Sequence, residues 1–212
     1  MDIKYFQRNC IRKGKNRKNV GDPMNVLKQM LQKAFLVLST PSKFFEKIRN
    51  EKEGLIEYLV LISLVFSILF AALFTVHEIF IGVGRFFIIG LIMAFASGFI
   101  VTLGIVFLET LIIHFFALIF RCKRGYNNTA KAVVYGNTPT FLFSWIPFVT
   151  IIATIYCWAI TVIGISKLHN VSIKKAIFVV VPISIVIIYL SILVMGYDSI
   201  LGPFASEILH LS

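Results

Sequence analysis

Two ionisable side chains, Glu109 and His114, lie within one long apolar stretch of this chain of 212 residues. A carboxylate in the middle of a membrane-spanning helix is costly and usually marks a transport path, a proton-handling group or a buried polar contact. The two residues are five positions apart, which is about 140° of rotation on a helix with about 3.6 residues per turn. They therefore do not share a helix face, and we do not expect them to bind a metal as a pair.

Glu109 lies near the centre of its apolar stretch and needs a polar partner from a neighbouring helix. A protonated Glu109 that is hydrogen-bonded there would be a structural contact, whereas an accessible one would take part in binding or in proton handling. Structural packing is the favoured interpretation, and the functional one stays open. The candidate partners are Tyr135, Asn137, Tyr156 and Thr161. The candidate intramembrane polar site comprises Glu109, His114, Tyr135 and Asn137.

Enzymatic signatures are absent from the sequence. It contains no HExxH motif, no glycine-rich phosphate loop, no GxSxG motif and no second intramembrane acid to pair with Glu109. The histidines are scattered, and the cysteines lack the spacing of a disulfide framework or a metal centre. These residues are His77, His114, His169, His210, Cys10, Cys122 and Cys157. We therefore expect no catalytic centre, no cofactor and no metal.

Two proline-containing segments predict irregular backbone. In the segment Tyr135-Gly136-Asn137-Thr138-Pro139, Pro139 removes a backbone donor, and the Asn137 side chain can partner the carbonyl that this frees. The expected result is a polar kink at Gly136 and Pro139 inside a membrane helix. Pro147 lies among aromatic residues in Trp145-Ile146-Pro147-Phe148, which is typical of a tight turn at the membrane interface.

The composition predicts that lipid surrounds the elements that carry these residues. Hydrophobic residues make up 58% of the chain, whereas soluble domains contain roughly 45–50% apolar residues. Residues 58–76 include no charged side chain, and about 18 such residues are enough to cross a bilayer core of about 30 Å. The predicted fold is an all-α integral membrane bundle.

The positive charge is concentrated before the first apolar run. The net charge is +11, and 13 of the 21 Lys and Arg residues precede that run. Next to a membrane domain, such charges favour anionic lipid headgroups over nucleic acid, at about 1 kcal/mol for each basic side chain near the surface. A plain topology signal is the alternative. The expected headgroup contacts are Arg12, Lys13, Lys15, Arg17 and Lys18.

Two short amphipathic helices are expected between the basic tail of residues 1–23 and the membrane domain. In residues 24–38 apolar side chains recur at three- and four-residue steps, and a second helix begins at Pro41. We expect both helices, within residues 24–52, to lie in the membrane interface. Phe44, Phe45 and Ile48 would give the second helix a lipid-facing side.

Loop charges divide the remaining apolar blocks into spans. Basic loops tend to remain in the cytoplasm, which places the N-terminus and the loops 121–131 and 167–175 on that side. The expected result is a membrane domain of residues 53–197 with five spans and an extracytoplasmic tail of residues 198–212. Residues 79–96 either lie along the interface or lengthen a tilted helix. The spans are expected at about 57–76, 97–120, 131–146, 149–166 and 176–197.

At these residues the chain resembles the Yip domain family of Ypt/Rab-interacting multispan membrane proteins. The resemblance covers about residues 39–197 and rests on three motifs that precede the first span, open the third and close the fourth. It implies five helices and a cytoplasmic N-terminus, as the loop charges do. The three motifs are Pro41-Ser42-Lys43-Phe44-Phe45, Ala132-Val133-Val134-Tyr135-Gly136-Asn137-Thr138-Pro139 and Ile163-Gly164-Ile165-Ser166-Lys167-Leu168-His169.

The resemblance also bears on partners. The resemblance implies that eukaryotic members are partners of prenylated Rab GTPases in vesicle traffic and membrane shaping. This chain has a short basic N-terminus instead of a long cytosolic region, and it looks closer to the compact prokaryotic members. A small GTPase partner is expected only if the protein is eukaryotic. The favoured function is a non-enzymatic scaffold or adaptor of the cell membrane, with lipid, other membrane proteins or a second copy as partners. The alternative is a small carrier or channel whose polar path includes Glu109 and residues 135–139.

Overall fold

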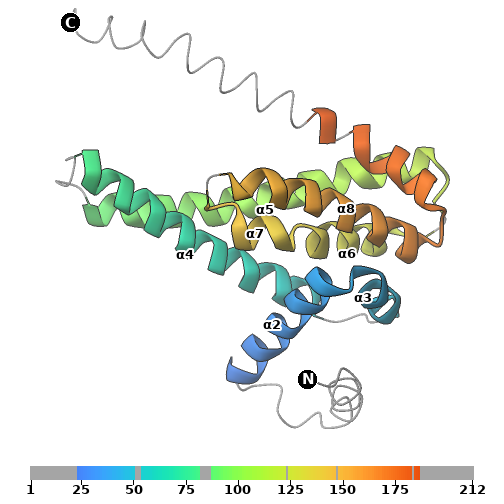
Figure 1. Cartoon of the computed structure of the whole chain (residues 1–212), viewed down its shortest axis with the longest axis horizontal. Helices are drawn as coiled ribbons and strands as arrows, with labels where there is room; N and C mark the ends of the chain where they lie inside the picture. The colour runs from blue at the N-terminus through green and yellow to red at the C-terminus, as the bar shows by residue number, and fades with distance from the viewer. Residues whose placement is uncertain are drawn as a thin grey trace, which may run out of the picture.

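The computed structural model describes residues 23–50, 54–81, 87–122, 124–146, 148–182 and 184–186. In these ranges the protein is all-helical and contains no strand, which confirms the predicted class (Figure 1). The numbered helices are α2 (Pro23–Ser39), α3 (Pro41–Ile48), α4 (Leu55–Ile81), α5 (Phe87–Ile119), α6 (Tyr126–Gly136), α7 (Thr138–Phe143) and α8 (Val149–His169). Residues 173–182 and 184–186 are also helical.

Three of the described helices are long and apolar enough to cross a membrane. They cover Leu55–Val76 in α4, Ile88–Ile119 in α5 and Val149–His169 in α8. The predicted spans at 57–76 and 149–166 fall within them, and the one at 97–120 does so as far as Ile119. The described residues therefore confirm several helices that could span a membrane, and they do not confirm the count of five.

Neither of the two other predicted spans is a single described helix. The span expected at 131–146 is divided between α6 and α7, with Asn137 between them. The span expected at 176–197 is helical as far as residue 186, and its remainder lies outside the described residues. The headgroup contacts expected at Arg12, Lys13, Lys15, Arg17 and Lys18, the turn at Pro147 and the tail 198–212 also lie outside them.

Helix α5 decides how most of residues 79–96 are arranged. It begins at Phe87, ten residues before the expected span, and continues without a break to Ile119. At about 1.5 Å per residue, 33 residues extend about 50 Å, which exceeds a bilayer core of about 30 Å. Residues 87–96 therefore lengthen a helix that must tilt or project from the bilayer, as one of the two alternatives had it.

The helices pack as a bundle to which α2 and α3 are attached on one side (Figure 1). Helix α4 packs along α5, and α6 and α7 pack against α8. Large buried side chains from different helices meet in the core, which extends from α2 to the helical residues that follow α8. The largest fully buried ones include Phe45, Ile62, Ile113, Ile160, Ile165 and Leu168.

Helix α3 corrects one prediction, because its apolar side faces protein instead of lipid. Phe44, Phe45 and Ile48 are only 4%, 0% and 2% exposed, and α3 packs against α8. The contact is so close that a Cβ atom at Gly164 of α8 would lie 2.9 Å from Cζ of Phe45. Apolar periodicity identifies the face that is buried, but it does not say whether lipid or protein covers it.

Helix α2 forms where it was expected, and its apolar residues divide between two faces. Met30, Ala34 and Val37 are buried, and α2 contacts α4, α6 and α7. Leu27 and Phe35 belong to a second apolar face that the bundle leaves exposed. The helix therefore uses part of its apolar surface to attach itself to the bundle and keeps the rest available.

Candidate functional site

The break between α6 and α7 is built by the residues around Asn137. Pro139 has no N–H to donate to the carbonyl oxygen of Tyr135, four residues earlier. The hydroxyl of Thr138 donates to that oxygen instead, at 2.7 Å. The Asn137 side chain was expected to take this role, and it donates to the carbonyl oxygen of Val133 at 3.1 Å. Side chains thus supply hydrogen bonds to the backbone where the helix is broken.

Gly136 allows the break to lie directly against α8. A Cβ atom at this position would be 2.1 Å from Oγ1 of Thr161 and 3.2 Å from the Cα atom of the same residue. Only a residue without a side chain lets the two backbones approach so closely, as small residues do in membrane helix packing. The glycine therefore holds Asn137 next to α8.

Asn137 joins three helices through its side-chain amide. Its Nδ2 donates to Oε2 of Glu109 on α5 at 2.7 Å, and the thiol of Cys157 on α8 donates to its Oδ1 at 3.2 Å. The carbonyl oxygen of Val133 can only accept, so the amide atom beside it must be the nitrogen. This fixes the direction of the hydrogen bonds: Cys157 donates to Asn137, and Asn137 donates to Glu109.

Tyr135, also expected at the Glu109 site, belongs to a neighbouring cluster. Its ring packs against those of Phe44 and Tyr58, with centroids 4.9 Å and 4.6 Å away, and its hydroxyl lies 3.5 Å from Nζ of Lys33. The hydroxyls of Tyr58 and Thr138 are 2.8 Å apart. Thr138 already donates to a carbonyl, so Tyr58 must be the donor in this pair.

The other expected partners of Glu109 point elsewhere. The Tyr156 hydroxyl donates to the carbonyl oxygen of Leu38 at the end of α2, and Thr161 is buried opposite Gly136. His114, one of the residues assigned to the site, lies 3.0 Å from Thr129 through its Nδ1 atom. Glu109 and His114 thus occupy separate clusters, in keeping with their different helix faces.

Sequence reasoning missed the contribution of Cys157, Tyr58 and Thr129. Each lies on a different helix from its partner and is separated from it by 15 to 80 residues. No local spacing could reveal these contacts. Among the described residues, no three His, Cys, Asp or Glu side chains come together in a way that could hold a metal ion.

A comparison with protein families decides what kind of protein carries this arrangement. The Yip1 domain family matches residues 35–195, which include α3, the α6–α7 break and α8. The chain belongs to the Yip1 domain family. No curated protein and no solved structure matches it. Together with the long apolar helices, the family makes this a multipass membrane protein.

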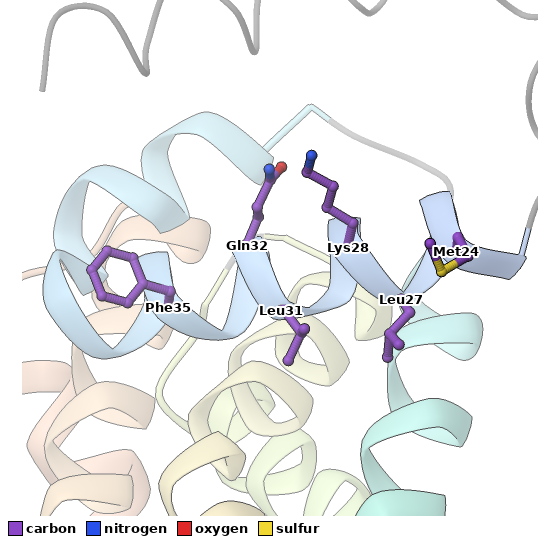
Figure 2. A pocket seen from close by; sticks show the side chains of 6 residues that line it. All are labelled: Met24, Leu27, Lys28, Leu31, Gln32 and Phe35. Atoms are coloured by element: carbon purple, nitrogen blue, oxygen red, sulfur yellow. The ribbon is translucent and has the colours of Figure 1, made fainter.

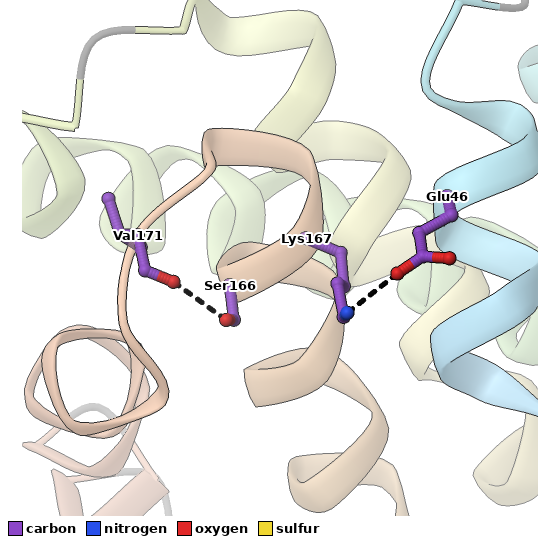
Figure 3. Close-up of polar contacts among 4 residues, drawn as sticks. All are labelled: Glu46, Ser166, Lys167 and Val171. Atoms are coloured by element: carbon purple, nitrogen blue, oxygen red, sulfur yellow. Dashed lines mark hydrogen bonds and ion pairs between the residues drawn. The ribbon is translucent and has the colours of Figure 1, made fainter.

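The Yip1 domain includes the last turn of α2 and all of α3, in agreement with their packing on the bundle. Two polar contacts hold α3 in place. Nζ of Lys167 on α8 lies 2.6 Å from Oε1 of Glu46 (Figure 3), and the buried Lys131 donates to the carbonyl oxygen of Ile48 at 3.0 Å. The hydrogen bond and the charge of Lys167 lower the pKa of Glu46 below its ordinary value of 4.5.

The Yip1 segment of residues 163–169 also forms the end of α8. Asn170, which follows it, adopts a left-handed conformation with φ of 56°, a conformation that asparagine tolerates at the end of a helix. The hydroxyl of Ser166 donates to the carbonyl oxygen of Val171 at 2.7 Å (Figure 3). The chain can therefore turn sharply after His169 and begin the helical residues 173–182.

Proposed function

We propose that this protein is a non-enzymatic membrane scaffold that organises the bilayer, and the membrane proteins around it, through its N-terminal segment. The observation that carries the proposal is the second apolar face of α2. Met24 and Phe35 are 76% and 65% exposed, although the opposite side of the same helix is buried in the bundle. An apolar face that the fold does not need implies an apolar partner outside the fold.

A shallow groove follows this second face. It has a volume of about 430 Å³, and Leu27 and Leu31 project from one side of α2 while Lys28 and Gln32 project from the other (Figure 2). Apolar side chains flanked by lysine are typical of a helix that lies in the headgroup region of a membrane. The residues that line the groove are Met24, Leu27, Lys28, Leu31, Gln32 and Phe35.

Charge supports an anionic lipid surface as the occupant of this face. Helix α2 contains no acidic residue, and seven of the first 18 residues of the chain are Lys or Arg. Anionic headgroups would attract this segment, and the apolar face would follow into the acyl boundary. A helix held rigidly on a membrane bundle would then spread the headgroups on one side of the bilayer.

The same charges support an orientation in the cell membrane. The N-terminus and the loops 121–131 and 167–175 would face the cytoplasm, because all three are basic. With five spans, the C-terminus would face the other side. Other membrane proteins or a second copy would be recruited through the lipid that α2 organises, and a small GTPase would be a partner only in a eukaryotic cell.

Reconstitution into lipid vesicles tests the scaffold. The wild type should deform vesicles that contain anionic lipid, as seen by electron microscopy, and should leave neutral vesicles round. A variant with Leu27→Gln, Leu31→Gln and Phe35→Gln should lose this activity, because these side chains are exposed and would no longer enter lipid. The matched control, Gln29→Ala with Ser39→Ala, alters exposed polar positions of the same helix and should keep it.

Either of two results would contradict the scaffold. One is a wild type that leaves anionic vesicles unchanged, and the other is a triple variant that deforms them as well as the wild type does. Circular dichroism of each variant in detergent would show that its helices remain folded.

A second function, a small carrier or channel, is favoured by one observation. The hydrogen bonds that link Cys157, Asn137 and Glu109 connect three helices at the point where one helix is broken. Broken helices and isolated acidic residues mark transport sites in membranes. A carrier predicts proton or cation flux in proteoliposomes that Glu109→Gln abolishes without unfolding the protein. A wild type without flux would leave the polar chain as a packing contact.

A further inference from the structure

Two histidines from different helices meet across one threonine, away from the Glu109 site. Nδ1 of His114 on α5 and Nε2 of His169 at the end of α8 each lie 3.0 Å from Oγ1 of Thr129, in the first turns of α6. Thr129 and His169 are buried, and His114 is half-buried. The three residues tie the ends of α5, α6 and α8 together beside the basic loops.

The hydrogen atoms available to this cluster show which charge state it accepts. A hydroxyl donates one hydrogen bond, so Thr129 can donate to one imidazole and must accept from the other. When both rings are neutral, the Nε2–H group of His169 donates a hydrogen bond to Oγ1 of Thr129. The hydroxyl of Thr129 then donates a hydrogen bond to Nδ1 of His114. Both contacts at 3.0 Å are then satisfied. The hydrogen-bond partners of the two imidazole rings therefore determine which ring nitrogen carries the hydrogen.

A proton added to either ring disrupts this arrangement. Protonated His114 must donate through Nδ1, which forces Thr129 to donate to His169 and moves the ring hydrogen of His169 to Nδ1. Nδ1 of His169 is buried and has no hydrogen-bond partner among the described residues. Protonated His169 leaves a charged donor in the same place. A buried donor without a partner is costly, and a charged one is costlier still.

The surroundings of the cluster also oppose protonation of its imidazole rings. Burial of the ring opposes a positive charge on His169 most strongly, and His114, when it is charged, and Arg124 in the loop before α6 oppose it further. The ring of Tyr126 packs edge-on against His114, with centroids 5.4 Å apart, and adds no negative charge at neutral pH. Lys167, two residues before His169, is paired with Glu46. Among the described residues, no acidic side chain is a cause that acts on the charge of His169.

We propose that His114, Thr129 and His169 form a proton-binding site that locks the ends of α5, α6 and α8 together when it is deprotonated and releases them when it takes up protons. The bound ligand is the proton itself, taken up from the side of the basic loops. Histidine suits this role because its imidazole titrates in the range that cells use for signalling. Release would free the loop between α5 and α6 without disturbing the Glu109 site.

Hydrogen exchange of the full-length protein in lipid nanodiscs tests the lock. Exchange of the amides of α6 is measured at about pH 7.5 and about pH 5.5 and corrected for the intrinsic effect of pH on exchange. An exposed imidazole titrates near about pH 6.5, so the opening equilibrium should rise about tenfold when His169 is protonated on opening. The amides of residues 55–76 in α4, which lie outside the cluster, should not respond.

A double variant, His114→Asn with His169→Gln, provides the matched control. Asparagine places its amide near the position of Nδ1 and glutamine near that of Nε2, so both can still bond to Thr129 and neither can take up a proton. The rise in α6 exchange should disappear in this variant, while His77 and His210 remain in place. The wild type can be judged alone if the variant does not fold.

Three outcomes would overturn the proposal. The first is a wild type in which corrected exchange of α6 is the same at both pH values. The second is an equal rise in α4 and α6, which would show general loosening of the bundle. The third is a folded double variant that responds to pH as the wild type does.

Discussion

At the scale of single residues, Asn137 shows how an amide can serve a broken membrane helix. It satisfies a backbone carbonyl of its own helix, donates to Glu109 and accepts from Cys157. The sequence named Glu109 and Asn137 as candidates because a carboxylate and an amide stand out in an apolar stretch. It could not name Cys157, since a thiol is ordinary in a membrane helix and only the contact of α8 with α6 brings it there.

Gly136 gives a prediction at this scale. Gly136→Ala should destabilise the protein by about 1–3 kcal/mol, because the added methyl group would overlap Thr161 and force α6 away from α8. Gly104→Ala is the matched control, since a Cβ atom there would meet no atom within 4 Å. Thermal unfolding in one detergent compares the two. Equal midpoints for the two variants would contradict the close approach seen at Gly136.

Glu46 gives a second prediction, on pH. Pairing with Lys167 lowers the pKa of Glu46 in the folded protein, so the stabilisation should be present above about pH 4.5, the ordinary value for glutamate, and should be lost as the pH falls through the folded pKa. The effect should be small and sensitive to salt, because the pair is exposed. Unfolding midpoints of the wild type and Glu46→Gln should therefore differ at neutral pH and converge in acid.

Lys167→Gln is the control for this pair. In that background the effect of Glu46→Gln should be much smaller at neutral pH, because the hydrogen bond and the charge of Lys167 are gone and only Arg49 still lowers the pKa of Glu46. A difference as large as the one in the wild type would contradict the role of Lys167.

At the scale of elements, α2 and α3 differ most from what their sequence suggested. Both were expected to form, and both do. Their apolar faces were expected to meet lipid, whereas α3 and one side of α2 meet the bundle. A period of three and four residues shows that a face will be buried. The identity of the covering surface depends on Gly164, more than a hundred residues away, which leaves room for Phe45.

The two phenylalanines of this segment provide a prediction about α2 and α3. Phe45→Ala should cost about 3–5 kcal/mol, because it leaves a cavity between α3 and α8. Phe35→Ala, at an exposed position of α2, should change stability by less than about 0.5 kcal/mol in detergent. Unfolding by a chaotropic detergent compares the two. A Phe45 variant as stable as the Phe35 variant would mean that α3 is a detachable interfacial helix.

At the scale of the whole molecule, the protein is a bundle with an N-terminal attachment that is part of the fold. Removing residues 1–38 would therefore disturb the contacts of α2 with α4, α6 and α7 as well as any lipid contact. Substitution of the exposed face of α2 separates these two roles. The long α5 and the divided α6–α7 segment also show that helices in apolar stretches need not follow the even lengths that hydropathy suggests.

The orientation of the whole chain is tested by labelling its ends. With five spans, a tag at the N-terminus should be accessible from the cytoplasm and a tag at the C-terminus only from the other side. Protease protection in sealed vesicles of both orientations measures this. If both tags were accessible only from the cytoplasm, the number of spans would be even, and the α6–α7 segment would enter the membrane without crossing it.

The all-α class, the long apolar helices and the family could be predicted from the sequence, because each depends on residue types and spacings within a few turns of chain. Tertiary structure decided that Asn137 is the partner of Glu109, that His114 pairs through Thr129 with His169, and that Phe45 faces Gly164. These contacts join residues 15 to 119 positions apart in the chain. Close approach of helix backbones, which small residues permit but do not direct, selects among many partners that hydropathy treats as equal.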